Sequence, residues 1–423
     1  MIISNEGQYE PKLLEKLPFF LLALMVLIGV FAPRFFAFGP EVVALIALFL
    51  WRFSYKSWPR VDLKLMGFML ALCGITAISS FWAVDADGAL DRAWKNALIF
   101  FPMVILASMA KQWPHQASLV FVKYLPFLCV ISGFICVIDL YLNGAFYYLT
   151  RDVPADNFFN RSLINRGVNV FLLMSAFSLF TMFVTQYWCA ARRMRARKYL
   201  CGILVCMVLA VMYQTHSQTG QAGVMIVVFV GSFFPVARKS FFSILGAILV
   251  LGIFLAPWIA QMMFEYLADG VHADPSTLIG QAYMADRMEI WDYIARKALE
   301  NPLYGFGVEA ARAIDHFDTA MLYTSTDHIL HPHNFILQLW IELGVIGAFM
   351  ASVFCLYILY AIWRIEDLNV RRFALAIYLA IFFMACTSYG IWQGWWLGLM
   401  GYAGVMMNIL QAQPKIKYEP RVE

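Results

Sequence analysis

Long apolar runs recur along the whole 423-residue chain and dominate what it can fold into. With 62% hydrophobic residues, 14% charged residues and a mean hydropathy of +0.70, the chain is too apolar for a soluble protein. The sequence therefore predicts an all-α polytopic membrane protein that forms one integral membrane domain over residues 1–423. About twelve transmembrane helices are expected, at residues 17–33, 39–52, 65–83, 97–110, 117–142, 167–191, 199–213, 221–236, 240–260, 333–362, 373–389 and 395–412.

The basic residues predict how these helices cross the membrane. If both termini are cytoplasmic, the inward-facing segments hold 20 of the 31 Lys and Arg residues, the outward-facing segments hold ten, and Lys123 alone falls within a helix. This bias follows the positive-inside rule and favours cytoplasmic termini. The first apolar run is followed by Pro33-Arg34 rather than by the small residues of a cleavage site, so we expect it to remain as a membrane helix.

One long hydrophilic segment, residues 261–332, is predicted on the outer face between the ninth and tenth helices. Loops of this length usually carry function. Within it, residues 283–300 have the periodicity of an amphipathic helix that lies along the membrane surface. Arg287 borders the apolar face of this helix, so we expect it to point toward the depth of the lipid head groups; a snorkelling arginine without further role is the alternative. The apolar face consists of Met284, Met288, Trp291, Ala295 and Ala298.

The segment ends in the sequence His331-Pro332-His333-Asn334. Pro332 suits the first position of a helix, because a missing N–H costs nothing there and its φ angle is already helical. The predicted helix therefore begins at Pro332. His333 would then lie in the first turn, where the helix dipole and unpaired N–H groups favour a neutral imidazole and a bound anion. A neutral histidine can act as a base.

A polar stripe follows on the same helix. Asn334, Gln338 and Glu342 recur every four residues among apolar residues, so they share one face. Polar groups at membrane depth usually face a protein interior or a water-filled cavity. The alternative is that these three residues only join helices together and that the histidines are solvated loop residues.

Two further outer segments indicate an anionic ligand. Arg161 and Arg166 stand immediately before the sixth apolar run, against the charge bias, and a guanidinium grips phosphate oxygens in a bidentate way. The polar turn at residues 214–221, with Ser217 and Gln218, lies at the same face between the seventh and eighth helices. It is either part of the same site or an ordinary solvated turn.

Other kinds of chemistry have weaker support. The turn at Gly305 and Gly307 has no strands around it and no Walker lysine occurs, so nucleotide-driven transport is not indicated. The eight cysteines form no CxxC pair and predict neither a disulfide framework nor a cysteine zinc site. A zinc site formed by Asp327, His328, His331 and His333 is an alternative. The HxH spacing argues against it, because it is expected to direct the rings of His331 and His333 apart.

Taken together, these motifs resemble the O-antigen ligases and the related O-antigen polymerases and bacterial protein O-oligosaccharyltransferases. The resemblance implies a GT-C-like, membrane-embedded glycosyltransferase that inverts the sugar and needs neither metal nor cofactor. It implies transfer of a glycan from undecaprenyl diphosphate to the lipid A core in lipopolysaccharide biosynthesis, at the periplasmic face of the bacterial inner membrane. The expected partners are that donor, that acceptor and the bilayer, with no nucleic acid, and the chain is expected to be a monomer. The resemblance is carried by His331-Pro332-His333-Asn334 with Leu337, by residues 342–347, by Arg287 with Trp291, by residues 301–307 and by the turn with Ser217.

The resemblance also implies roles for single residues. His333 would be the base and Arg287 would neutralise the leaving diphosphate. Gln218 stands where the family turn commonly has an arginine, and the role of that arginine therefore cannot be carried over to this position. Arg161 or Arg166 is the better candidate for a second arginine that binds the diphosphate. The residues expected to bind the diphosphate or the acceptor are Arg161, Arg166, His331, Asn334, Gln338 and Gln218.

Three other functions stay open at this point. A polymerase or a protein O-oligosaccharyltransferase would use the same donor and differ in the acceptor, which the sequence does not state. A flippase for lipid-linked sugars would need basic groups along an interior path, and Lys123 is the one cation within a predicted helix.

Overall fold

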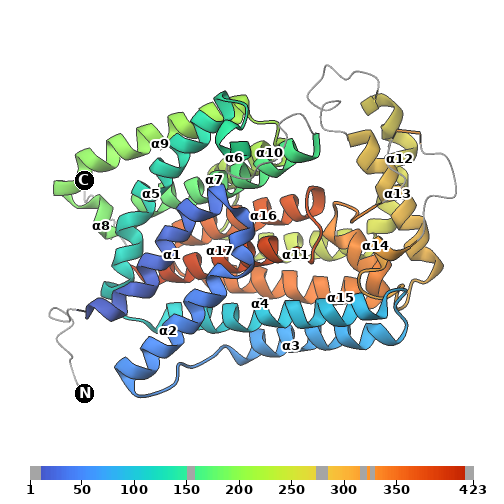
Figure 1. Cartoon of the computed structure of the whole chain (residues 1–423), viewed down its shortest axis with the longest axis horizontal. Coiled ribbons are helices and arrows are strands. Elements are labelled where there is room, and N and C mark those ends of the chain that lie inside the picture. The colour runs from blue at the N-terminus through green and yellow to red at the C-terminus, as the bar shows by residue number, and fades with distance from the viewer. Residues whose placement is uncertain (1–10, 150–157, 273–283, 315–321, 324–328, 415–423) are drawn as a thin grey trace. The chain divides into compact units, whose positions relative to one another are not determined.

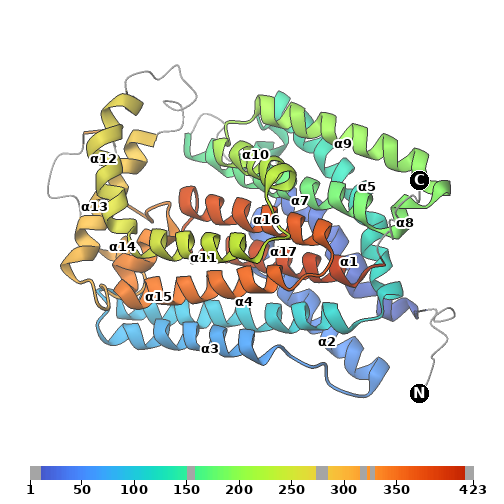
Figure 2. The same cartoon turned by 180° about the vertical axis from the view of Figure 1, so that it is seen from behind.

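The computed structural model describes residues 11–149, 158–272, 284–314, 322–323 and 329–414. These residues are helical with short connections, and no strand occurs among them. The chain divides into two compact units, Met1–Met66 with Ile99–Val228 and Gly394–Glu423, and Gly67–Leu98 with Phe229–Gln393. Figures 1 and 2 show the helices from opposite sides.

The first unit packs α1 against α2, α5 and α7. Buried polar side chains join its helices through backbone carbonyls: Tyr402 Oη donates to Leu22 O at 2.5 Å, and Trp188 Nε1 donates to Val122 O at 2.9 Å. The helices α3 (Leu63–Ile78), α4 (Ala86–Gln112) and α10 (Gln218–Phe233) contribute residues to both units. The first unit further contains α1 (Leu13–Phe31), α2 (Gly39–Tyr55), α5 (His115–Tyr141), α6 (Ala145–Leu149), α7 (Phe158–Val184), α8 (Gln186–Cys189), α9 (Met194–Gln214) and α17 (Gly394–Ala412).

In the second unit, α15 contacts α11, α13, α14 and α16, and α12 lies beside α13 in both views (Figures 1 and 2). The polar residues singled out around position 333 therefore lie where several helices meet. The bounds are α11 (Lys239–Phe254), α12 (Ala256–His272), α13 (Met284–Glu300), α14 (Ala310–Ala313), α15 (Phe335–Trp363) and α16 (Leu368–Thr387).

Eight helices of the described residues are long and apolar enough to cross a membrane, or nine if one bent pair counts as a single crossing. A multi-pass membrane protein is therefore confirmed, whereas the expected twelve crossings are not. The bent pair is α11 with α12, at an angle of 74°. Because α12 continues to His272, the helical part extends beyond residue 260, where the hydrophilic segment was expected to begin.

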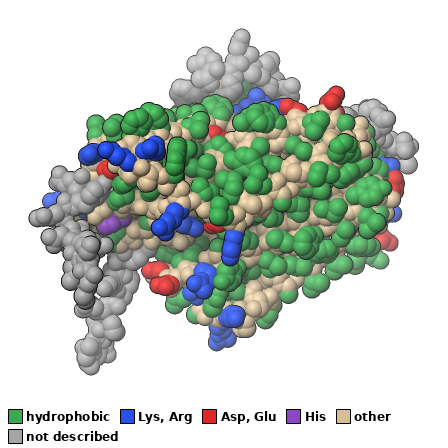
Figure 3. Space-filling model, turned by 90° about the horizontal axis from the view of Figure 1, so that it is seen from below, with side chains coloured by type: hydrophobic (Ala, Val, Ile, Leu, Met, Phe, Trp, Pro, Cys, Tyr) green, Lys and Arg blue, Asp and Glu red, His purple; other side chains and the backbone are tan. Residues whose placement is uncertain are grey.

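The surface fits a lipid environment. Leu45, Ile248 and Phe349 are each about 60% exposed, which would be unfavourable in water over so large an area. On the face drawn in Figure 3, hydrophobic side chains cover most of the visible surface. All eight cysteines are free thiols.

The predicted start of the helix at Pro332 is wrong, because α15 begins at Phe335. Asn334 is its N-cap, and its side-chain oxygen accepts from the N–H groups of Ile336 at 3.0 Å and Leu337 at 3.3 Å. His333 stands one residue outside the helix, with a left-handed φ of 54°. A capping asparagine thus determines the helix start, and the proline belongs to the approach to it.

A glycine breaks α15 in the middle. Gly344 has φ 59° and ψ −142°, so its backbone leaves the helical conformation inside the run. The loop at residues 302–307 fills this break: Phe306 N–H donates to Ile341 O at 2.8 Å, Gly307 N–H to Glu342 O at 2.9 Å, and Val345 N–H to Pro302 O at 2.8 Å. Gly305 is required there, because it has φ +66° and a Cβ would lie 2.5 Å from the carbonyl carbon of Glu342.

Candidate functional site

The carboxyl end of α16 holds both residues expected to be catalytic. Arg287 Nη1, from α13, donates to Thr387 O at 2.7 Å. His333 Nδ1 lies 2.7 Å from the next carbonyl, Ser388 O. The last carbonyls of a helix have no partner within it and carry partial negative charge, so a guanidinium and an imidazole N–H are suitable partners. Two segments 46 residues apart in the chain thereby meet at one helix end.

The hydrogen bond to Ser388 also determines the tautomer of His333. A carbonyl oxygen only accepts, so Nδ1 carries the proton and the lone pair of the neutral ring remains on Nε2. Burial, reinforced by the nearby charge of Arg287, lowers the pKa of His333 from 6.5 to about 4, and the bond to Ser388 opposes this shift. The ring is therefore neutral at physiological pH, and its basic Nε2 has no hydrogen-bond partner among the residues that the structure describes.

Arg287 is half-buried on the packed side of α13. Burial lowers the pKa of its guanidinium, while Tyr389 and Asp286 oppose the shift. Since an arginine starts from so high a value, the group remains a cation at neutral pH. The side chain of Arg287 is engaged with the end of α16, so it is not a snorkelling arginine without a partner in the protein. That it lies at the depth of the lipid head groups stays a prediction.

The helix at residues 283–300 is confirmed, as α13 spans Met284–Glu300 and buries the predicted residues Met288, Trp291, Ala295 and Ala298. Two acidic residues of the same helix are also buried. Glu289 accepts from the N–H groups of Leu322 and Tyr323, and Asp292 pairs with Arg296 at 2.9 Å. Paired in this way, both carboxylates are stable on the packed face.

His331 lies beside His333 rather than apart from it, so the expectation that their rings diverge is wrong. The ring centroids are 4.2 Å apart, because the left-handed backbone at His333 folds the chain back. The N–H of His333 donates to His331 Nδ1 at 3.3 Å, and His331 Nε2 lies 2.9 Å from the side-chain amide of Gln393. Within the described residues no group of three or more His, Cys, Asp or Glu is arranged to hold a metal ion; Asp327 and His328 lie outside them.

Gln338 and Glu342 face the protein interior as expected, with 4% and 0% exposure. Gln338 Nε2 donates to Glu342 Oε1 at 3.0 Å, while its oxygen accepts from Ile391 N–H at 2.9 Å. Trp392 Nε1 donates to Glu342 Oε2 at 2.5 Å. Asn334 leaves this stripe and caps the helix instead. The stripe thus binds the connection between α16 and α17.

That connection, residues 388–393, was missed in the sequence, although it supplies Ser388 to His333 and Gln393 to His331. A second missed pair supports it. Arg92 donates to Trp392 O at 2.7 Å and pairs with Glu309 at 2.5 Å. The available signal was the short break Ser388-Tyr389-Gly390 between two apolar runs, which predicts a turn but not its partners.

The remaining candidate residues belong to the first unit. Arg166 lies over the ring of Trp395, 5.6 Å from its centroid, while Arg161 is on α7 and its side chain is outside the described residues. Gln218 is the first residue of α10. That the two arginines and Gln218 converge with Arg287 stays a prediction.

Ser217 and its neighbours Thr215 and Thr219 in the turn before α10 are buried. The alternative that this segment is an ordinary solvated turn is therefore not supported. Ser217 is 5% exposed, and its Oγ donates to Asn169 Oδ1 at 2.7 Å. The backbone N–H of Ser217 donates to Thr215 Oγ1 at 3.0 Å. Hydrogen bonds within the first unit thus fix the position of Gln218.

Comparison with known proteins gives a consistent result. Residues 202–352 match the family model described as O-antigen ligase. The curated protein "Putative polysaccharide ligase" of Rickettsia prowazekii is 31% identical over 180 residues, and that of Rickettsia conorii is 29% identical over 177 residues. Each alignment covers 41% of this chain and 42% of the relative, so the match spans less than half the length of these relatives. The resemblance drawn from the motifs is therefore confirmed: residues 202–352 are similar to the O-antigen ligase family.

Proposed function

We propose that the protein is a glycosyltransferase of the O-antigen ligase type, which moves a glycan from undecaprenyl diphosphate to the lipid A core at the periplasmic face of the bacterial inner membrane. The observation that carries this proposal is the pairing of Arg287 and His333 on consecutive carbonyls of one helix end. It presents a cation and a neutral base with a free Nε2 side by side. A glycosyl transfer from a diphosphate needs these two groups.

In the proposed reaction, the acceptor hydroxyl gives its proton to His333 Nε2 as its oxygen attacks the anomeric carbon. The bond between that carbon and the diphosphate oxygen breaks on the opposite face, so one displacement inverts the anomeric centre. Undecaprenyl diphosphate leaves with the bonding electron pair, and Arg287 stabilises the added negative charge. The reaction as written requires no metal ion.

The low pKa of His333 fits this sequence of events. A free imidazole with a pKa of about 4 stays unprotonated but is a weak base. When the diphosphate binds, its negative charge offsets that of Arg287 and raises the pKa of His333. Donor binding would therefore strengthen the base at the moment when it is needed.

The other candidate residues receive supporting roles in the proposal. Arg161 and Arg166 contribute further charge to the diphosphate, and Gln218 contributes hydrogen bonds. His331, Asn334 and Gln338 orient the segment that carries His333, since each bonds to the segment, to α15 or to residues 388–393. Both termini are cytoplasmic and residues 261–332 are periplasmic in this arrangement.

The function is tested by reconstituting the purified protein with undecaprenyl diphosphate glycan and lipid A core in excess EDTA. We expect glycan on the lipid A core and released undecaprenyl diphosphate, and a rate about 10²- to 10⁴-fold lower with the His333→Ala variant. Longer glycan on the carrier would indicate a polymerase instead, and glycan on an added protein acceptor would indicate an O-oligosaccharyltransferase. Activity that is lost in EDTA and returns with zinc would contradict the metal-independent mechanism.

A further inference from the structure

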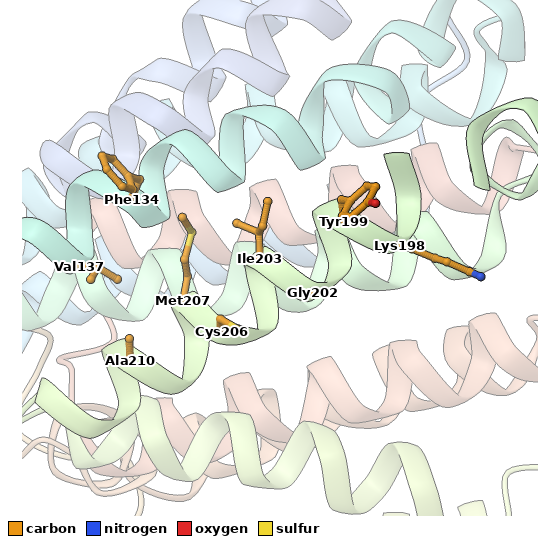
Figure 4. A pocket seen from close by; sticks show the side chains of 9 residues that line it. All are labelled: Phe134, Val137, Lys198, Tyr199, Gly202, Ile203, Cys206, Met207 and Ala210. Atoms are coloured by element: carbon orange, nitrogen blue, oxygen red, sulfur yellow. The ribbon is translucent and has the colours of Figure 1, made fainter. Parts of the chain in front are cut away.

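A groove runs along the first unit, between α5 and α9, and its lining contains none of the residues of the proposed reaction. It has a volume of about 570 Å³. Figure 4 shows its lining, with Phe134 and Val137 on α5 and with Lys198 and Ala210 at opposite ends of the α9 side. We refer to it as the α5–α9 groove.

The groove is hollow because of one stripe on α9. Lys198, Gly202, Cys206 and Ala210 are four residues apart, so they lie above one another on a single helix face. The last three have small side chains and fill little of the space. A Cβ added at Gly202 would meet no atom within 4 Å, so the floor of the groove is open at that point.

The dimensions favour a hydrocarbon chain over a helix. Twelve residues separate Lys198 from Ala210, which gives a length of roughly 18 Å along α9. Dividing the groove volume of 570 Å³ by this length gives a mean cross-section of roughly 30 Å². A helix with side chains has a diameter of about 10 Å and would need roughly 80 Å². A helix could therefore lie over the groove but not within it, whereas a single extended chain fits inside it.

One end of the groove carries an available positive charge. Among the described residues, Lys198 has no hydrogen bond and no ion pair, whereas Arg193 lies over the ring of Tyr187 and Arg197 donates to Cys189 Sγ at 2.9 Å. A cation at the end of an apolar groove suits a phosphate attached to a hydrocarbon chain.

We propose that the α5–α9 groove is a binding site for an anionic glycerophospholipid, with one acyl chain along α9 and the phosphate at Lys198. The charge bias of the sequence puts Lys198 on the cytoplasmic side, opposite the predicted side of the donor diphosphate. The lipid is therefore distinct from the undecaprenyl donor.

The test is native mass spectrometry of the purified full chain with phosphatidylglycerol or phosphatidylcholine. We expect the wild type to prefer phosphatidylglycerol, and Lys198→Ala to lose roughly fivefold in affinity for it, in proportion to one basic residue at a membrane surface. Gly202→Leu fills the groove and should weaken binding of both lipids. Lys239→Ala and Gly252→Leu are matched controls, since Lys239 is exposed at the start of α11 and a Cβ at Gly252 also meets nothing within 4 Å.

Equal binding of the two lipids by the wild type, or unchanged binding in Lys198→Ala and Gly202→Leu, would overturn the proposal. A dimer that Gly202→Leu dissociates would identify a second copy of the chain as the occupant. Displacement of phosphatidylglycerol by undecaprenyl phosphate at equal concentration would assign the groove to the polyprenyl chain instead. Because transfer activity is not the readout, these outcomes are independent of the proposed reaction.

Discussion

His333 combines three features in one side chain: a left-handed backbone, a proton fixed on Nδ1 and a depressed pKa. If Nε2 is the base, His333→Ala should lower transfer by about 10²- to 10⁴-fold, the range typical of general base catalysis. Donor binding should change little, because it depends on the arginines. His331→Ala should lose less, since its ring bonds to the backbone of His333 and to Gln393. Near wild-type transfer by His333→Ala would mean that departure of the diphosphate alone drives the reaction.

The pKa of His333 makes the pH dependence informative. Its base form exists above a pKa of about 4 in the free protein, so kcat/KM should persist through mildly acidic pH and fall only as the pH approaches that value. The profile of kcat, which reports the donor complex, should fall at a higher pH because the bound diphosphate raises the pKa of His333. Two coincident profiles, or a fall of kcat/KM near 6.5, would contradict this account.

For Arg287, geometry should matter more than charge. Arg287→Lys should lose activity nearly as severely as Arg287→Ala, on the order of 10²-fold, because an ammonium cannot make bidentate contact with a diphosphate. Arg296→Lys is a matched control on the same helix, since its side chain is 62% exposed and the substitution keeps a positive charge beside Asp292. Full activity of the Arg287→Lys variant would show that a positive charge suffices. Transfer rates at saturating donor provide the comparison.

The backbone hydrogen bonds between residues 302–307 and the break in α15 should contribute to stability. Gly305→Ala should destabilise the fold by about 1–3 kcal/mol, because alanine is strained at φ +66° and its Cβ would crowd the Glu342 backbone. Gly252→Ala, in open space on α11, should be neutral or stabilising. Thermal unfolding in detergent measures the difference, and equal midpoints for the two variants would show that the close approach to α15 does not require glycine at position 305.

Helices with strong periodicity could be predicted from the sequence, and those determined by capping or by distant partners could not. The pattern of Met288, Trp291 and Ala295 gave α13 nearly to its ends, because burial of one face determines such a helix. The start of α15 was misplaced by three residues, since Asn334 competes with Pro332 and wins through two hydrogen bonds. Sequence alone did not indicate this choice.

The candidate site was predicted in part for a related reason. His333 and Arg287 stand out by residue type, whereas their meeting point depends on Thr387 and Ser388, which contribute only backbone carbonyls. Every residue has a backbone carbonyl, so the residue type does not reveal which carbonyl forms such a contact. Arg92 likewise acts on the backbone of Trp392, so its role follows only from the packed structure.

The chain as a whole should cross the membrane with both termini on the cytoplasmic side. Single cysteines introduced at Gly270, near the end of α12, and at Asp367, the N-cap of α16, should then react with an impermeant reagent from opposite sides. Labelling of both cysteines from the same side would contradict the predicted topology, and with it the periplasmic location of the site. Reporter fusions at the same positions provide an independent measurement.

The end of α16 has a consequence for which changes the chain can tolerate. Inserting or deleting one residue in this helix would rotate its last carbonyls by about 100°, since a turn holds 3.6 residues. Thr387 and Ser388 would then face away from Arg287 and His333 at the same time, although no side chain of the site had been altered. We therefore expect insertions and deletions to be tolerated in the connection before Asp367 but not within α16. The number of residues in this helix is then as critical as the identity of the base.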